Sequence, residues 1–167
     1  MNTTTRVLLA ASIVVALAAC SKKVKEEVVT DTTTPVTTAP ASDGRYTPAD
    51  LDTDACLRQR TVYFDFDQDT LRPEFQAIMA CHAKYLSDRP ESRMTLEGNA
   101  DERGTREYNL GLGERRGNAV SGALQGAGGS AGQITVVSYG EERPVCTESA
   151  ESCWQRNRRV EIVYTAK

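Results

Sequence analysis

The apolar residues between positions 61 and 165 follow two kinds of spacing in turn, and this alternation limits the folds open to the chain. Four segments place apolar residues at every second position, as half-buried strands do: 61–66, 93–98, 133–139 and 157–165. Two segments between them have helical spacing: 73–86, with Pro73 at its start, and 105–125, with Thr105 as the capping residue. The order β-α-β-α-β-(turn or short helix)-β predicts an α/β two-layer sandwich.

The N-terminus has the features of an exported, lipid-anchored protein. Arg6 precedes an apolar run over residues 7–19, which is shorter than the ~20 residues of a membrane-spanning helix. We therefore interpret residues 1–19 as a signal peptide. The run ends in small residues before Cys20, similar to a bacterial lipobox, so Cys20 is the predicted lipidation site; the alternative is an ordinary signal peptide with a chance cysteine. Ser21, where an Asp would retain a lipoprotein at the inner membrane, favours the periplasmic face of the outer membrane.

A change of composition separates this anchor from the folded part of the chain. Residues 20–52 are rich in Thr, Pro, Ala and Ser and have no apolar periodicity, so they are predicted to form a disordered tether. About 30 residues reach at most ~100 Å from the membrane. Residues 53–167 are predicted to form one domain of ordinary size.

The cysteines indicate disulfides rather than a metal site. The chain has five, and lipidation of Cys20 leaves four in an exported domain, which allow three pairings. Cys146 with Cys153 would close one short polar loop, and Cys56 with Cys81 would then join the start of the domain to its first helix. No CxxC is present and the chain has one histidine, so we expect neither a metal nor another cofactor.

The net charge and the single histidine argue against two classes of function, nucleic-acid binding and catalysis by histidine. The chain has 20 Lys+Arg and 23 Asp+Glu, a net charge of −3. A mild negative balance without a basic run argues against a nucleic-acid partner. His82 lies on the apolar side of the predicted helix 73–86, where packing is a commoner role than catalysis.

The segment 96–120 combines acids, arginines and glycines in a strand, a turn and a helix. A phosphate-binding loop needs its glycines in the turn, but Gly111 and Gly113 fall inside the helix and no Lys follows. In-helix glycines cost up to ~1 kcal/mol each relative to Ala, so they suggest a close approach by another group. Asp101 and Glu102 lack a nucleophile or a second acid to form a catalytic pair. We expect a protein that is not an enzyme.

One arginine interrupts an apolar stripe of the predicted helix 105–125. Leu112, Arg116, Val120 and Leu124 stand four residues apart and share one face. A partly desolvated arginine needs a partner, and Asp101 in the preceding turn is one candidate. The pair either forms an internal bridge or binds the ammonium and the carboxylate of a zwitterionic ligand. The spacing alone leaves both alternatives open.

Several motifs together resemble the OmpA-like C-terminal domain family. They are VYFDFD, EGNADERGTREYN, SYGEERP, NRRVEI and the helix pattern that starts at Asn109, and the resemblance covers essentially residues 61–164. It implies a mixed four-stranded sheet with helices on one face. It also implies non-covalent binding of peptidoglycan through the meso-diaminopimelate of the stem peptide. The matching site residues are Asp101 and Arg116 for the two charges, Asn109, Leu112, Asn99 and Ala100 around them, and Phe66 and Asp67 on the opposite wall.

The resemblance also implies partners and a place in the cell envelope. Lipid-anchored proteins similar to this chain tether the outer membrane to the cell wall. They interact with TolB and, as part of the Tol system, contribute to envelope integrity and cell division. Asn99 stands where these relatives commonly have His, and an amide cannot become cationic. Arg158 matches an arginine for which we expect a supporting role. The alternatives are a structural or protein-binding lipoprotein outside the Tol system, with an internal Asp101–Arg116 bridge, and a wall hydrolase, which the missing catalytic constellation disfavours.

Overall fold

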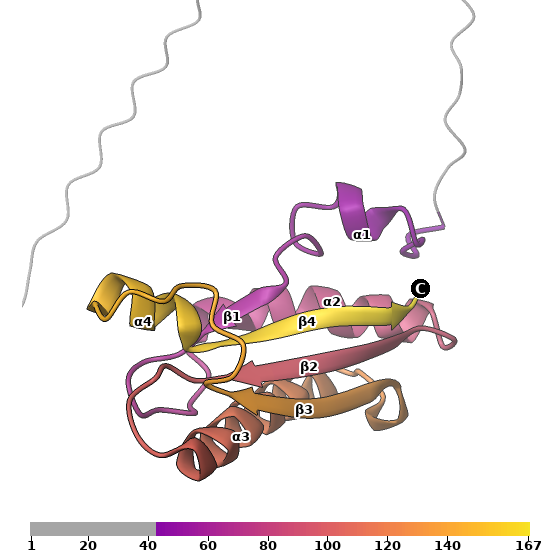
Figure 1. Ribbon diagram of the computed structural model, residues 1–167. Coiled ribbons are helices and arrows are strands. Elements are labelled where there is room, and N and C mark those ends of the chain that lie inside the picture. The colour runs from indigo at the N-terminus through magenta and orange to yellow at the C-terminus, as the bar shows by residue number, and fades with distance from the viewer. Residues whose placement is uncertain (1–42) are drawn as a thin grey trace, which may run out of the picture. The chain divides into compact units, whose positions relative to one another are not determined.

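Four strands form one mixed sheet in the computed structural model, which describes residues 43–167 (Figure 1). The elements are α1 (Asp50–Thr53), β1 (Thr61–Tyr63), η1 (Pro73–Phe75), α2 (Gln76–Asp88), β2 (Arg93–Asn99), α3 (Arg106–Gly126), η2 (Ala131–Gln133), β3 (Ile134–Gly140), α4 (Glu151–Asn157) and β4 (Arg159–Ala166). The predictions for the signal peptide, for Cys20 and for most of the tether lie outside the described residues. No helix within residues 43–167 is long and apolar enough to cross a membrane.

The sheet and its helices form the predicted α/β sandwich. The strand order is β1-β4-β2-β3; β2 and β3 are parallel, whereas β4 is antiparallel to both β1 and β2. Helices α2 and α3 cover the same face of the sheet (Figure 1). Between the two layers lie the apolar residues of the strands and helices, among them Met79, Leu96, Val120 and Ile162. The fold class expected from the sequence is confirmed.

The first strand is shorter than its apolar alternation predicts. Its third apolar residue, Phe66, is 54% exposed, whereas Phe64 is buried and its N–H still donates to the carbonyl of Arg158 at 2.9 Å. The chain then turns, with a bond from the N–H of Gln68 to the carbonyl of Asp65 at 3.2 Å. Asp67 has a φ of 57°, a left-handed conformation that ends an extended segment. The prediction of a strand through residue 66 was therefore wrong.

The folded unit begins before the expected boundary at residue 53. Leu51 and Leu57 are fully buried against Tyr85 of α2, and Tyr46 and Tyr164 pack against the same cluster. Residues 46–57 are thus part of the packed domain and not of a free tether. Two apolar residues and an aromatic ring in a Thr- and Asp-rich stretch are too few to produce a periodic signal, so the sequence did not reveal this attachment.

Two disulfides join the four cysteines of the domain. Cys56 pairs with Cys81, and Cys146 pairs with Cys153. This is one of the three pairings that the sequence allowed. His82 is fully buried in α2, with Nδ1 2.8 Å from the Tyr164 hydroxyl and Nε2 3.1 Å from the carbonyl of Gln59. It packs within the fold, as its place on the apolar side of the helix indicates.

Candidate functional site

Helix α3 lies unusually close to the sheet, and glycines make this possible. A Cβ on Gly98 of β2 would lie 2.0 Å from the carbonyl oxygen of Gly113, and one on Gly113 would lie 2.3 Å from Oγ of Ser138. The group that approaches Gly113 is therefore the sheet and not a ligand. At Gly111 a Cβ would meet only the end of the Arg115 side chain, at 3.4 Å, so the expected close approach is absent there.

Arg116 is fully buried within the apolar stripe of α3. Its Nε donates to the carbonyl of Gln68 at 2.8 Å, and its Nη atoms donate to the carbonyls of Asn99 at 2.9 Å and Asp65 at 3.1 Å. One guanidinium thus joins α3 to the end of β2 and to the loop after β1. Burial lowers the pKa of Arg116 to about 10, which still leaves the group charged at neutral pH.

Asp101 lies in the turn between β2 and α3 and is surrounded by donors. Its carboxylate accepts two bonds from the Arg103 side chain, at 3.1 and 2.6 Å, one from the Arg103 N–H at 3.1 Å and one from Nη1 of Arg158 at 3.2 Å. Burial alone would raise the pKa of this carboxyl group, but the bonds from Arg103 and Arg158 outweigh it and lower the pKa below its usual value. The side chain is ionised and only 4% exposed.

The direct Asp101–Arg116 bridge that the sequence left open is not formed. Asp101 pairs with Arg103 and Arg158, while the bonds of Arg116 go to backbone carbonyls. Arg158 is 4% exposed and also donates to Glu151 and to the carbonyl of Phe64. These contacts give Arg158 a supporting role. The internal bridge was one of the two alternatives that the spacing left open. It does not form because Arg103 of the same turn and Arg158 just before β4 already bind Asp101.

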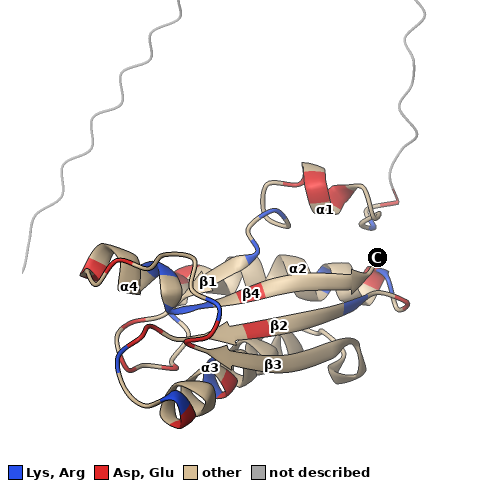
Figure 2. Cartoon of the chain, viewed as in Figure 1, with Lys and Arg blue, Asp and Glu red and all other residues tan. Residues whose placement is uncertain are grey.

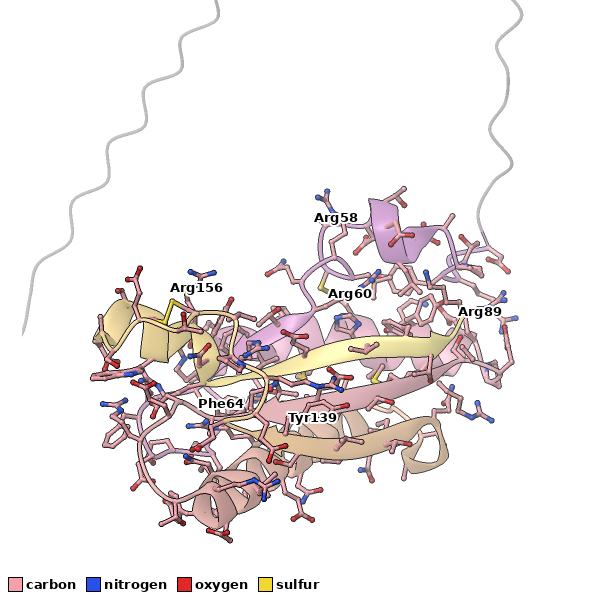
Figure 3. The ribbon with its side chains drawn as sticks, in the orientation of Figure 1. Arg58, Arg60, Phe64, Arg89, Tyr139 and Arg156 are labelled. Carbon is pink, nitrogen blue, oxygen red and sulfur yellow. A yellow bond between two sulfur atoms is a disulfide. The ribbon has the colours of Figure 1, made fainter. Side chains whose placement is uncertain are left out.

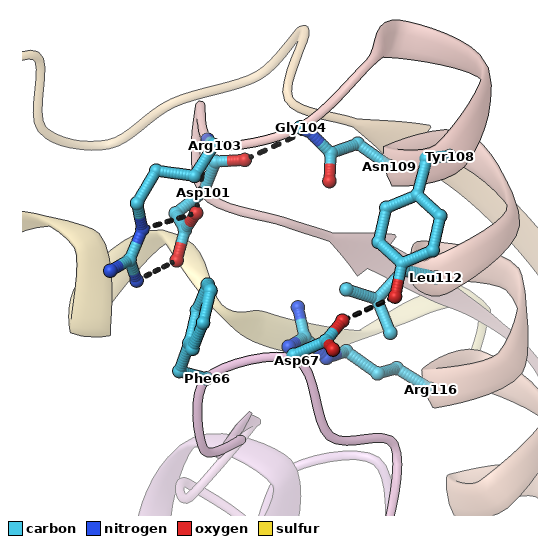
Figure 4. Close-up of a pocket in the computed structure, with 9 residues that line it drawn as sticks. All are labelled: Phe66, Asp67, Asp101, Arg103, Gly104, Tyr108, Asn109, Leu112 and Arg116. Atoms are coloured by element: carbon cyan, nitrogen blue, oxygen red, sulfur yellow. Dashed lines mark hydrogen bonds and ion pairs between the residues drawn. The ribbon is translucent and has the colours of Figure 1, made fainter.

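Asp101 and Arg116 nevertheless line the same cavity, of about 250 Å³ (Figure 4). The other lining residues come from the loop after β1, the turn before α3 and the first turns of α3: Phe66, Asp67, Arg103, Gly104, Tyr108, Asn109 and Leu112. Asp101 with Arg103 lies across the cavity from Asp67 with Arg116 (Figure 4). Acidic and basic residues are concentrated on these loops and on the start of α3 (Figure 2). Each of the two sides of the cavity therefore carries one acidic and one basic residue.

Aromatic rings line the cavity, and hydrogen bonds hold its two sides in place. Phe66 is 54% exposed and Tyr108 is 45% exposed, so each offers a ring at the cavity. The Tyr108 hydroxyl donates to Asp67, which joins the first turn of α3 to the opposite loop. Nδ2 of Asn109 donates to the carbonyl of Asp101 at 3.1 Å and so fixes the turn.

Two of the expected site residues lie behind the cavity rather than in its lining. Asn99 and Ala100 are buried at the end of β2, where the N–H of Ala100 donates to the carbonyl of Gly140. The Asn99 side-chain amide donates to the carbonyl of Glu97 at 2.9 Å, and the backbone carbonyl of Asn99 accepts a bond from Arg116. Their contribution is to position Arg116 and the turn, because both residues are buried where β2 ends and the turn begins.

Three lining residues were missed by the sequence reasoning: Arg103, Gly104 and Tyr108. No local pattern marks Arg103, which stands between Glu102 and Gly104 in the turn. Its partners include Asp101 of the same turn, but Phe66 and Trp154 come from distant segments that only the fold brings to it. Among residues 43–167, no group of three or more His, Cys, Asp or Glu side chains is placed to hold a metal ion.

The mixed sheet, the helices on one face and the charged cavity define a small ligand-binding domain of the α/β class. The model of the OmpA family matches residues 63–158. The peptidoglycan-associated lipoprotein of Haemophilus influenzae is 45% identical over 121 residues, which are 72% of this chain and 76% of that protein. The peptidoglycan-associated lipoprotein of Pseudomonas putida is 50% identical over 113 residues, 67% of this chain and 68% of that protein.

A solved structure agrees with these sequence matches. The crystal structure of the peptidoglycan-associated lipoprotein from Burkholderia pseudomallei superposes with a TM-score of 0.68 at 42% identity, and covers 70% of this chain and 98% of that one. The chain belongs to the OmpA family, and within it to the peptidoglycan-associated lipoproteins.

Proposed function

We propose that this protein binds peptidoglycan non-covalently and tethers the outer membrane to the cell wall. The names of its relatives associate those proteins with peptidoglycan. The observation that carries the proposal is the charge pattern of the cavity, in which two carboxylates and two guanidinium groups line about 250 Å³. This space is smaller than the ~300–1,000 Å³ of a drug-sized ligand site. It suits the end of one side chain rather than a sugar strand.

The ligand that fits this pattern best is the free end of meso-diaminopimelate. That side chain is an aliphatic stem that ends in an ammonium and a carboxylate on one carbon. An ammonium group can bind Asp101 or Asp67, a carboxylate can pair with Arg103 or with the positive charge of Arg116, and the stem can lie against Phe66. A ligand with one sign of charge would bring that charge close to like-charged groups of the lining, which is unfavourable in a partly desolvated site.

Arg116 contributes to this proposed site in two ways. Three of its five N–H donors hold backbone carbonyls, so its first role is to fix the loop that carries Phe66 and Asp67. Its second role is electrostatic, since its positive charge favours a carboxylate in the cavity. Because the guanidinium is fully buried, it is held rigid before the ligand arrives, and this reduces the entropic cost of binding.

Competition on the unmodified protein tests the chemistry of the ligand. The domain is bound to purified sacculi that contain diaminopimelate, and free meso-diaminopimelate or lysine methyl ester is then added. We expect meso-diaminopimelate to release the domain and lysine methyl ester, which lacks the carboxylate, to be much weaker. Equal release by the two amines would contradict recognition of a zwitterion, and no binding to sacculi would contradict the function itself.

A pair of matched substitutions locates the site. Asp101→Asn removes one charge-assisted acceptor from the cavity and is expected to weaken binding to sacculi about 10- to 100-fold. Asp69→Asn is the control, since Asp69 lies in the loop after β1, pairs with Arg115 at 3.0 Å and does not line the cavity. The urea midpoint of each variant verifies folding. Equal affinity of the two variants would place the ligand elsewhere.

The proposal extends to the anchor, the partners and the absence of catalysis. Lipidation of Cys20 would hold the protein at the periplasmic face of the outer membrane, and TolB, from the Tol system, would compete with the wall for the domain. Sacculi incubated with the domain are expected to release no soluble muropeptides. TolB added to sacculus-bound domain is expected to displace it. Steady release of muropeptides would identify a hydrolase instead.

A further inference from the structure

The segment between β3 and β4 is a long connection outside the sheet, which we call the excursion, and it contacts a residue of the cavity. Residues 141–158 leave the sheet, form the seven-residue helix α4 and rejoin it at β4. The disulfide Cys146–Cys153 lies within this excursion (Figure 3). A helix of seven residues is not stable by itself in water, so other contacts must hold α4 in place.

Arg103 is stacked between two aromatic rings, and one of them belongs to α4. Its guanidinium carbon lies 3.9 Å from the centre of the Phe66 ring and 4.2 Å from the centre of the Trp154 ring. The same guanidinium forms the two-pronged contact with Asp101. Trp154 does not line the cavity. It therefore contacts Arg103 from outside the cavity, and cation–π contacts of this kind favour one position of an otherwise flexible side chain.

Further polar contacts join α4 to the turn that carries Asp101. Oε1 of Glu102 accepts bonds from Nε1 of Trp154 at 3.0 Å and from Oγ of Ser149 at 2.7 Å. Glu151 accepts from Arg158 at 2.6 Å and lies 3.6 Å from Nη1 of Arg103. These bonds orient α4 relative to the turn. They also place acidic groups around the arginines that hold Asp101.

The disulfide is attached to α4 beside the residue that carries the stacking ring. Cys153 is 1% exposed and is the immediate neighbour of Trp154. Asn157 closes the same loop, since its side chain accepts from the N–H groups of Val145 and Cys146 and donates to the carbonyl of Cys146. The covalent bond and this side chain hold the two ends of the excursion together. The position of Trp154 thus depends on the integrity of this loop.

We propose that Trp154 and the Cys146–Cys153 disulfide are positioning elements for Arg103, and that they set the affinity of the cavity for its ligand. This inference rests on the proposed binding of a zwitterionic wall peptide. Without the Trp154 ring, Arg103 keeps Asp101 and Phe66 as partners but loses the support that confines it. Its guanidinium then samples positions that cover Asp101 or leave the cavity, and both outcomes weaken binding.

The test compares Trp154→Ala and Trp154→Phe in binding to sacculi. Trp154→Phe retains a ring over Arg103 and loses only the bond to Glu102, so we expect it to bind nearly as wild type. Trp154→Ala is expected to weaken binding about 3- to 10-fold, the effect of one partly exposed cation–π contact. In a background that already carries Arg103→Ala, Trp154→Ala should have no further effect. Equal losses in the two backgrounds, or equal losses for Phe and Ala, would overturn the proposal.

The disulfides supply a matched pair of controls. Cys146→Ser with Cys153→Ser is expected to weaken binding to a similar extent as Trp154→Ala, whereas Cys56→Ser with Cys81→Ser should leave the affinity unchanged. Wild-type affinity in the first double variant would contradict the role of the disulfide. Failure of the wild-type domain to bind sacculi would instead count against the proposed function, so the two failures are distinguishable.

Discussion

A region with a disulfide lies at each end of β4, and the two regions differ in polarity. At its start lies the cavity, with the loop closed by Cys146–Cys153, three arginines and two acids. Near its end lies the N-terminal attachment, with Leu51, Leu57 and Tyr85 buried together beside Cys56–Cys81. We call these regions the cavity end and the attachment end. The attachment end is apolar and closed, whereas the cavity end holds several charged groups close to solvent.

This difference indicates a division of labour within one small domain. Burial of aliphatic and aromatic side chains stabilises the fold by about 25 cal/mol per Å² of apolar surface. Charged groups that are buried and held by partners contribute less to stability, because desolvation opposes their pairing. The attachment end therefore serves mainly stability, and in the proposed function the cavity end serves recognition. Arg116 is the exception, since it lines the cavity and also joins three segments of the fold.

The largest expected effect concerns that exception. Arg116→Ala removes a large buried side chain and leaves three carbonyls without their donor, and we expect a loss of about 4 kcal/mol in the free energy of unfolding. Arg115→Ala, the neighbouring residue on the exposed side of α3, should cost about 0.5 kcal/mol or less. Urea unfolding measures both. A loss of unfolding free energy as small as that of Arg115→Ala would mean that Arg116 serves recognition alone. No residue that lines the cavity would then be an exception to the division between the two ends.

Removal of the two disulfides separates the ends most directly. Closure of a longer loop restricts the unfolded chain more, and the sequence separations are 25 residues for Cys56–Cys81 and 7 for Cys146–Cys153. The chain-entropy relation gives about 3.5 and about 2.5 kcal/mol for the two bonds. We expect the first double serine variant to show the larger fall in urea midpoint and the second the larger loss of affinity. The reverse order in either measurement would contradict the assignment of stability to the attachment end and of recognition to the cavity end.

The smallest expected effect is a pH dependence at the attachment end. Burial lowers the pKa of His82 below its usual value, so the folded state keeps the ring neutral while the unfolded chain takes up a proton below about pH 6.5. Stability should be complete above that pH and fall as the pH decreases toward the lower folded pKa, by at most about 1.4 kcal/mol per pH unit. His82→Gln should remove this dependence. Thermal unfolding between pH 5 and 8 measures it, and identical profiles for the two proteins would exclude the effect.

Much of the fold followed from local patterns. The order of strands and helices, the cap at Thr105 and the buried stripe of α3 agree with the structure because each depends on residues close together in the chain. The first strand was predicted too long, since Phe66 continues the alternation but faces the cavity. The attachment of residues 46–57 was not predicted, because few apolar residues without periodicity do not indicate what they pack against.

The sequence by itself determined that an arginine would be buried in an apolar row, with an acid in the turn before it. Helical spacing and the polarity of neighbouring residues are sufficient for that. Only the tertiary structure decided which distant groups satisfy these charges: loop carbonyls for Arg116, and Arg158, in addition to the neighbouring Arg103, for Asp101. The physical reason is that a local pattern tells which face of an element is buried. The partner that covers that face comes from a distant segment, as Trp154 does for Arg103.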